Sequence, residues 1–227
     1  MQTWQDLKDQ SDSDIERVLF EIIKNVLPNA MCFGEETSPP FQTAEGVTAF
    51  LIDPVDGSHN RERGLPYYSV CIAQYDLGRV SCSMVFVPEW ATLYLALEGR
   101  AYRSTPFGMD EIKVRAPVPP PDRAISVFKR QFLSGGNYPE KIRTISCSSI
   151  ELCLVAQGAL DAFVDQTGYE KQCDIAAALY ILTAAGGHYH YDCPVDPLSG
   201  ADPDWLRPRR LIAASQEVYL DEYSWNP

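Results

Sequence analysis

Segments with the pattern of β-strands alternate along this chain with segments that have the pattern of α-helices, and this alternation narrows the possible folds more than any other feature. Runs of strands between helices favour a layered α/β or α+β architecture. Helix patterns occur at residues 14–27, 149–156 and 174–185, with room for a short helix after residue 214. Strand patterns occur at residues 31–33, 47–52, 67–75, 79–87, 92–97, 124–128, 162–165 and 211–214.

The clearest helix covers residues 14–27, where apolar residues recur at helical spacing along one stripe. Ser13, followed three residues later by Glu16, has the pattern of a capping box, and Pro28 ends the helix. The most proline-dense segment, residues 116–122, predicts a boundary or rigid spacer. We therefore expect an N-terminal α+β part, residues 1–118, and a C-terminal α/β part, residues 119–227.

Acidic residues outnumber basic ones by 31 to 19, which gives a formal net charge of -12 at pH 7. This balance argues against non-specific binding to nucleic acid or to an anionic membrane, because no excess of positive charge is present to neutralise phosphates. An acidic protein can still bind an anionic ligand, but it then needs a local reversal of charge, usually a bound cation.

The chain has seven cysteines, most of them in apolar runs, and no C-x-x-C pair. This usage indicates reduced core thiols and a cytoplasmic protein, rather than a disulfide framework or a zinc site. Residues 1–6 have neither the basic nor the apolar region of a signal peptide, and no apolar run is long enough to span a membrane. We expect a soluble intracellular protein.

The strand at 47–52 runs directly into Asp53-Pro54-Val55-Asp56-Gly57-Ser58. Taken alone, this sequence is most simply a β-turn. The alternative is functional, because open α/β sheets place their sites at strand ends, where Gly57 and Ser58 would offer backbone N–H groups to a phosphate.

Four acids occupy such positions, each at the end of a predicted strand or the start of a predicted helix: Glu35, Asp53, Asp56 and Asp174. Each has an ordinary explanation by itself; Asp174, for example, suits a helix N-cap. Together they form a set of hard oxygen ligands that suits Mg²⁺ or Mn²⁺ better than zinc. Two such ions about 3.5–4 Å apart can stabilise both the attacking and the leaving oxygen of a phosphoryl transfer.

Motifs for competing chemistries are absent from the sequence: it contains no Walker A loop, no G-x-G-x-x-G after a strand and no G-x-S-x-G elbow. Cys147 lies in a polar run and is a candidate nucleophile, but no histidine is clearly placed to activate it.

Three motifs follow one another along the chain: Gly34-Glu35-Glu36, Asp53–Ser58, and Cys173-Asp174-Ile175-Ala176-Ala177 followed by Ala184–Gly187. In order and approximate spacing they resemble the motifs of the inositol monophosphatase family. Leu160–Asp165 and Arg210–Ala214 are also similar to segments of that family, so the resemblance covers nearly the whole chain.

The resemblance implies a layered α-β-α-β-α sandwich and a Mg²⁺-dependent phosphatase, with two or three ions and Mn²⁺ as a possible substitute. The implied reaction is attack of a metal-activated water on a small phosphate monoester, either inositol monophosphate or fructose 1,6-bisphosphate. The resemblance also implies a homodimer.

The resemblance assigns roles to individual residues. The implied metal ligands are Glu35, Asp53, the carbonyl of Val55, Asp56 and Asp174. Ser58 stands where the family has a threonine and, paired with Asp12, would orient the attacking water together with Glu35. The implied substrate contacts are Asp56, the amides of Gly57 and Ser58 at the phosphate, and Asp165 at a hydroxyl group.

Two alternatives stay open. A 3′(2′),5′-bisphosphate nucleotidase would share every metal ligand but would need a stacking or apolar pocket beside Asp165. A non-catalytic interaction subunit with the same fold is suggested by departures from the family pattern at His59, Cys147 and Cys173, and by about one helix fewer before the first motif.

Overall fold

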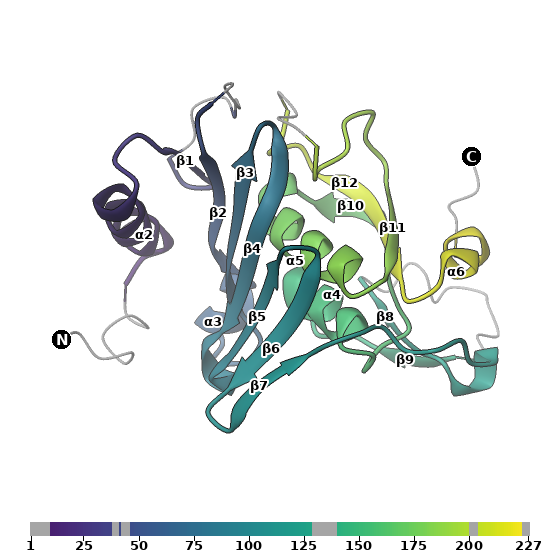
Figure 1. Ribbon diagram of the computed structural model, residues 1–227. Coiled ribbons are helices and arrows are strands. Elements are labelled where there is room, and N and C mark those ends of the chain that lie inside the picture. The colour runs from purple at the N-terminus through teal and green to yellow at the C-terminus, as the bar shows by residue number, and fades with distance from the viewer. Residues whose placement is uncertain (1–9, 38–40, 42–45, 129–139, 200–203, 224–227) are drawn as a thin grey trace.

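The computed structural model describes residues 10–37, 41, 46–128, 140–199 and 204–223. Its elements form five layers, which Figure 1 shows from left to right: helix α2, a first sheet, the central helices α4 and α5, a second sheet and helix α6. This is the α-β-α-β-α sandwich that the resemblance implies.

The first sheet has seven strands in chain order, β1 to β7, with β1 parallel to β2 and antiparallel pairing from β2 onward. Its strands are β1 (Met31–Gly34), β2 (Ala49–Asp56), β3 (Ser69–Asp76), β4 (Arg79–Val87), β5 (Thr92–Leu97), β6 (Arg100–Thr105) and β7 (Gly108–Glu111). In β3, buried Ser69, Cys71, Ala73 and Tyr75 alternate with more exposed residues, so one face of the sheet packs into the core.

The second sheet has five strands in the order β11-β12-β10-β8-β9. Its strands are β8 (Ala124–Val127), β9 (Lys141–Arg143), β10 (Ala162–Glu170), β11 (His188–Tyr191) and β12 (Arg209–Ala214). Strand β10 is parallel to β8 and antiparallel to β12, and its register with β12 shifts between Asp165 and Glu170. Strand β10 continues through this irregularity to Glu170, five residues beyond the strand that the sequence predicts at 162–165.

Helices α4 (Ser148–Ala156) and α5 (Gln172–Ala184) lie between the two sheets (Figure 1). Both are apolar on nearly all sides, as expected of helices covered by a sheet on each face. One core cluster joins them to residues of both sheets, such as Tyr75, Tyr94 and Phe163. In sequence, the strands of the first sheet precede the proline-rich segment and those of the second sheet follow it. Because the two sheets share one core, however, the division into residues 1–118 and 119–227 stays a prediction.

Helix α2 (Asp12–Val26) begins differently from the sequence prediction. Its N-cap is Ser11, whose side chain accepts a hydrogen bond from the Asp14 backbone N–H at 3.2 Å. The expected capping box of Ser13 and Glu16 is therefore wrong. Glu16 is fully buried, because its carboxylate turns inward and accepts a hydrogen bond from the Glu36 backbone N–H at 3.0 Å.

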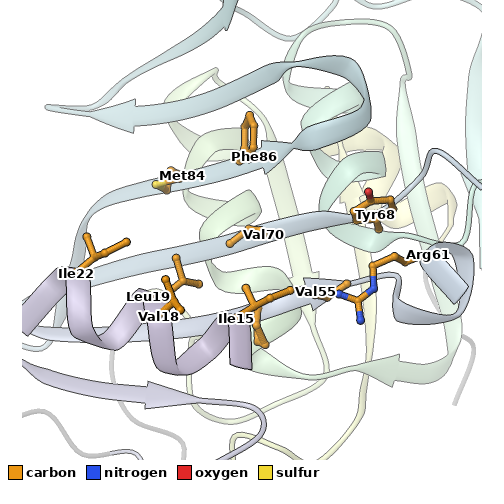
Figure 2. A pocket seen from close by; sticks show the side chains of 11 residues that line it. Ile15, Val18, Leu19, Ile22, Val55, Arg61, Tyr68, Val70, Met84 and Phe86 are labelled. Carbon is orange, nitrogen blue, oxygen red and sulfur yellow. The ribbon is translucent and has the colours of Figure 1, made fainter. Parts of the chain in front are cut away.

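Helix α2 covers only part of the outer face of the first sheet. A groove of about 190 Å³ lies between the helix and strands β3 and β4. Figure 2 shows Ile15 and Ile22 of α2 on one side of it and Val70, Met84 and Phe86 of the strands on the other. The apolar stripe predicted from the sequence is thus only partly buried in the described structure.

The remaining helices are short: α3 (Ser58–Glu62), α6 (Glu217–Glu222) and single 3₁₀ turns at Pro88–Trp90 and Pro120–Asp122. Strands β6, β7 and β9 were not predicted, because their short sequences lack a clear alternation of apolar residues.

No disulfide joins the seven cysteines, all of which lie in described positions. Among the described helices, none is long and apolar enough to cross a membrane.

Candidate metal centre and active site

A cavity of about 370 Å³ opens where elements of both sheets and the central helix layer end together. All five predicted metal ligands line it, although they come from three separate parts of the chain. The lining residues are Glu35, Asp53, Val55, Asp56, Gly57, Ser58, His59, Phe128, Ser146, Ser148, Tyr169, Glu170, Lys171 and Asp174.

Strand β2 carries two of these carboxylates because it continues through Asp53 and Asp56 instead of ending at residue 52. Its register with β3 shifts between these two residues. Asp53 is 1% exposed and accepts a hydrogen bond from the Val55 backbone N–H at 2.8 Å. Asp56 accepts hydrogen bonds at Oδ2 from the Ser149 backbone N–H at 2.8 Å, from the Ser149 hydroxyl and from the Cys147 thiol at 3.2 Å. The β2 acids are therefore held rigidly by the protein.

Glu35 and Asp174 meet from opposite halves of the molecule. Glu35 directly follows β1, and Asp174 lies at the third position of α5, where its Oδ2 accepts the Lys171 backbone N–H at 3.1 Å. Asp174 thus also helps to cap α5, although the N-cap itself is Lys171. The Cys173 thiol donates to Asp174 Oδ1 at 3.0 Å, and the ligating atoms of Glu35, Cys173 and Asp174 all lie within 4.8 Å of one another.

Ser58 stands at the start of α3, directly after Gly57. Gly57 has φ 88°, and a side chain there would meet the Tyr67 carbonyl oxygen, so glycine is required. The Ser58 hydroxyl lies 2.7 Å from Asp12 Oδ2 and 2.8 Å from the Val55 carbonyl oxygen. The pairing of Ser58 with Asp12 that the resemblance implies is therefore present in the geometry.

The site is strongly electronegative. Burial raises the pKa of Asp53 well above its ordinary range, and the carboxylates of Asp174, Asp56 and Glu35 raise it further. Burial, followed by the neighbouring Glu35, also raises the pKa of Asp174 to about 7. Buried like charges of this kind are stable when a cation neutralises them. A cluster of hard carboxylate oxygens fits a divalent cation such as Mg²⁺, and the Val55 carbonyl adds a neutral oxygen to the set.

Asp165 does not line the cavity. It is fully buried, and its carboxylate accepts hydrogen bonds from the Thr167 backbone N–H at 2.7 Å, the Thr167 hydroxyl at 2.6 Å and the Tyr169 backbone N–H at 2.7 Å. Asp165 therefore stabilises the irregular part of β10. The expected contact with a substrate hydroxyl stays a prediction that this geometry does not favour.

Several residues of the site were missed by the sequence analysis. Lys171 forms an ion pair with Glu35, and Glu170, 2% exposed, brings a fifth carboxylate to the cavity wall. Burial raises the pKa of Glu170 well above its ordinary range. Glu170 ends the extended β10 and Lys171 follows it as the N-cap of α5, and no local pattern in the sequence predicts that extension.

Arg61 was also missed as a contributor to the site. Its guanidinium forms an ion pair with Asp12 Oδ1, on the carboxylate that accepts from Ser58 at Oδ2. Asp12 is thus positioned from two sides by residues of α3.

Residues 2–223 match the model of the inositol monophosphatase family. The chain belongs to this family.

Members of the inositol monophosphatase family are metal-dependent phosphatases that act on small phosphorylated substrates. The chain is 28% identical over 222 residues to a putative Nus factor SuhB of Neisseria meningitidis, an alignment that covers 91% of this chain and 79% of the relative. It is 26% identical over 189 residues to the 3′(2′),5′-bisphosphate nucleotidase CysQ of Salmonella typhimurium, with 79% and 74% coverage.

A solved structure shares the fold. The inositol monophosphatase of Thermotoga maritima superposes with a TM-score of 0.76 at 24% identity, over 93% of this chain and 79% of that chain. The sandwich predicted from the resemblance is confirmed by this likeness and by the layers described above.

Proposed function

We propose that this member of the inositol monophosphatase family is a Mg²⁺-dependent phosphatase that hydrolyses inositol monophosphate, fructose 1,6-bisphosphate or both. The observation that carries the proposal is the convergence of Glu35, Asp53, Asp56 and Asp174 on one cavity, beside the Ser58–Asp12 pair. These four carboxylates and the Val55 carbonyl would hold the cations. Bound Mg²⁺ would supply the positive charge that attracts the phosphate, and would lower the pKa of the attacking water.

The protein's own residues then orient the reaction. The Ser58 hydroxyl donates a hydrogen bond to Asp12 Oδ2 at 2.7 Å, so the Ser58 oxygen would accept a hydrogen bond from a water molecule in the cavity. Glu35 would accept a hydrogen bond from the same water. The backbone N–H groups of Gly57 and Ser58, at the wall of the cavity, would donate to the phosphate oxygens. Asp56, held by Ser149, would position the substrate phosphate relative to the cations.

Phosphate release from inositol 1-phosphate and fructose 1,6-bisphosphate, with Mg²⁺ and then with excess chelator, tests this proposal. We expect turnover that chelator abolishes, and loss of turnover in Asp53→Asn and Asp174→Asn. Asp110→Asn, an exposed carboxylate on β7, is the matched control and should behave as wild type. If both Asp53→Asn and Asp174→Asn kept wild-type turnover, the assignment would be wrong.

A second candidate is a 3′(2′),5′-bisphosphate nucleotidase. It is favoured by two aromatic rings at the cavity wall, Phe128 and Tyr169, whose centroids lie 5.6 Å apart. Aromatic rings of this kind can stack on a nucleobase, and Tyr169 is 49% exposed. A kcat/KM for 3′-phosphoadenosine 5′-phosphate above that for inositol 1-phosphate, reduced about tenfold or more in Tyr169→Ala, would select this candidate.

A non-catalytic interaction subunit is the third candidate. It is favoured by the Lys171–Glu35 ion pair, because the Lys171 ammonium places a positive charge among the carboxylates where a cation would otherwise be required. Calorimetric titration with Mg²⁺ distinguishes the phosphatase from the interaction subunit. Binding of Mg²⁺ that Lys171→Met strengthens supports the phosphatase, whereas absence of both Mg²⁺ binding and turnover in folded protein supports the interaction subunit.

A further inference from the structure

A second polar cavity, of about 550 Å³, lies at the end of the second sheet, where β10, β11 and β12 come together. We call it the arginine cavity, because Arg207, Arg209 and Arg210 line it. Its other lining residues are Thr167, Gly168, His190, Tyr191, Asp192, Cys193, Pro194 and Pro208.

The charge of this wall is opposite to that of the whole protein. The described residues that line the cavity include three arginines and one acidic residue, Asp192, so their formal charges sum to +2 with His190 neutral. The complete chain has a net charge of -12. A local concentration of positive charge on so acidic a molecule favours one compact anion rather than an extended polyanion, which the rest of the surface would repel.

One of the three arginines, Arg210, is held in place by side-chain contacts of the fold. Arg210 forms an ion pair with Asp192, at 2.8 Å from Nε and 2.7 Å from Nη2. Its aliphatic part lies against Gly168, which adopts φ 77° and has no side chain to fill the space. Arg209 begins β12 opposite Glu170, and Arg207 stands in the turn before that strand. A guanidinium group set like that of Arg210 loses little conformational freedom when it binds an anion.

We propose that the arginine cavity binds a phosphate group. Guanidinium groups pair bidentately with phosphate oxygens, and a phosphate monoester carries close to two negative charges at neutral pH, which matches the formal excess in the wall. The cavity has the size of a small-molecule site. It shares one chain segment with the candidate active site: Thr167 and Gly168 line the arginine cavity, and the next residues, 169–171, line the active site.

Calorimetric titration with inorganic phosphate in low-salt buffer with excess chelator tests the proposal. Without divalent cations, the carboxylates of the candidate metal centre repel phosphate, so binding reports the arginine cavity. We expect wild-type protein to bind phosphate and the double variant Arg207→Gln/Arg210→Gln to bind at least about tenfold more weakly. Arg79→Gln, an exposed arginine at the start of β4, is the matched control.

Asp192→Asn keeps the test informative if the arginine variant folds poorly. Removing this carboxylate should tighten phosphate binding several-fold, because it removes the negative charge that competes for Arg210. No phosphate binding by folded wild-type protein, or unchanged binding in both variants, would overturn the proposal.

The phosphate could belong to the substrate or to a separate molecule, and kinetics distinguish these two sources. If it is the second phosphate of a bisphosphate substrate, Arg207→Gln raises KM for fructose 1,6-bisphosphate and leaves KM for inositol 1-phosphate unchanged. If it is a separate anion, both KM values stay unchanged while binding of inorganic phosphate is lost. The chelator titration needs no turnover, so its result is independent of the proposed phosphatase activity.

Discussion

At the scale of single residues, the hydroxyl of Ser58 is the group of the candidate site whose position is most closely defined by its neighbours. It lies within hydrogen-bond distance of both Asp12 and the Val55 carbonyl, although it has one proton to donate. A side chain that merely filled space would not need Asp12 beside it.

Replacement of Ser58 by alanine should therefore lower kcat by about 10²-fold and leave KM nearly unchanged, because the group acts on the attacking water rather than on substrate binding. Ser58→Thr keeps the hydroxyl and should retain most of the activity. Steady-state kinetics with Mg²⁺ measure both. Equal losses in the alanine and threonine variants would contradict a role for the hydroxyl.

Glu151 is a second residue whose surroundings have a measurable consequence. It is fully buried in α4, and its Oε1 accepts the Ile145 backbone N–H at 2.8 Å and the Ser126 hydroxyl. Burial is the main cause that raises the pKa of Glu151 from 4.5 to about 7. Since the folded protein holds this proton more tightly than the unfolded chain, stability from this group is complete below pH 4.5 and is lost as the pH rises through 7.

Glu151→Gln should remove this pH dependence. We expect the free energy of unfolding of wild type to fall, relative to the variant, by about 3 kcal/mol between pH 4.5 and pH 8. Urea denaturation at a series of pH values measures the difference, with Glu217→Gln, an exposed glutamate of α6, as the control. A constant difference between wild type and Glu151→Gln across this range would contradict the raised pKa.

At the scale of elements, helix α2 matters because it presents Asp12 to the active site from its first turn. Its start depends on the N-cap Ser11 and not on Ser13. Ser11→Ala should lower the free energy of unfolding by about 1 kcal/mol, the usual cost of losing an N-cap. Ser13→Ala removes only an exposed hydrogen bond to Glu36 and should change it by a few tenths of a kcal/mol. Urea denaturation of the two variants decides between the positions.

At the scale of the whole molecule, the candidate metal centre joins residues on both sides of the proline-rich segment. Glu35, Asp53 and Asp56 precede that segment, and Asp174 follows it. A cation bound by all four would link the first sheet to the central helix α5. Binding to the folded protein alone would stabilise it by an amount that grows with the logarithm of the ratio of cation concentration to dissociation constant.

Mg²⁺ at about 100 times its dissociation constant should raise the free energy of unfolding by about 2.7 kcal/mol. In Asp174→Asn this gain should largely disappear. In chelator, however, the variant should be at least as stable as wild type, because it lacks one of the four mutually repelling carboxylates. Thermal denaturation with and without Mg²⁺ measures both effects, and an equal Mg²⁺ response in the two proteins would contradict the site.

Much of the fold follows from local features of the sequence. The helix at 14–27 and the strands at 67–75, 79–87 and 92–97 agree with α2, β3, β4 and β5 to within two residues. Periodicity and turn chemistry are properties of neighbouring residues, so they can be read without the fold. The acidic motifs are local in the same sense, and their order along the chain was enough to indicate the family and a shared metal site.

Other features were decided by the tertiary structure. Distant segments meet at the hydrogen bond between Glu16 and the Glu36 backbone and at the Lys171–Glu35 ion pair. The hydrogen bond from the Tyr169 backbone to Asp165, in the irregular part of β10, was likewise decided by the tertiary structure. The arginine cavity likewise exists because three strand ends converge. The residue type alone does not show whether a charged side chain is buried or exposed. Packing decides which side chains lie together in a low-dielectric interior, where each needs a hydrogen-bonding or charged partner.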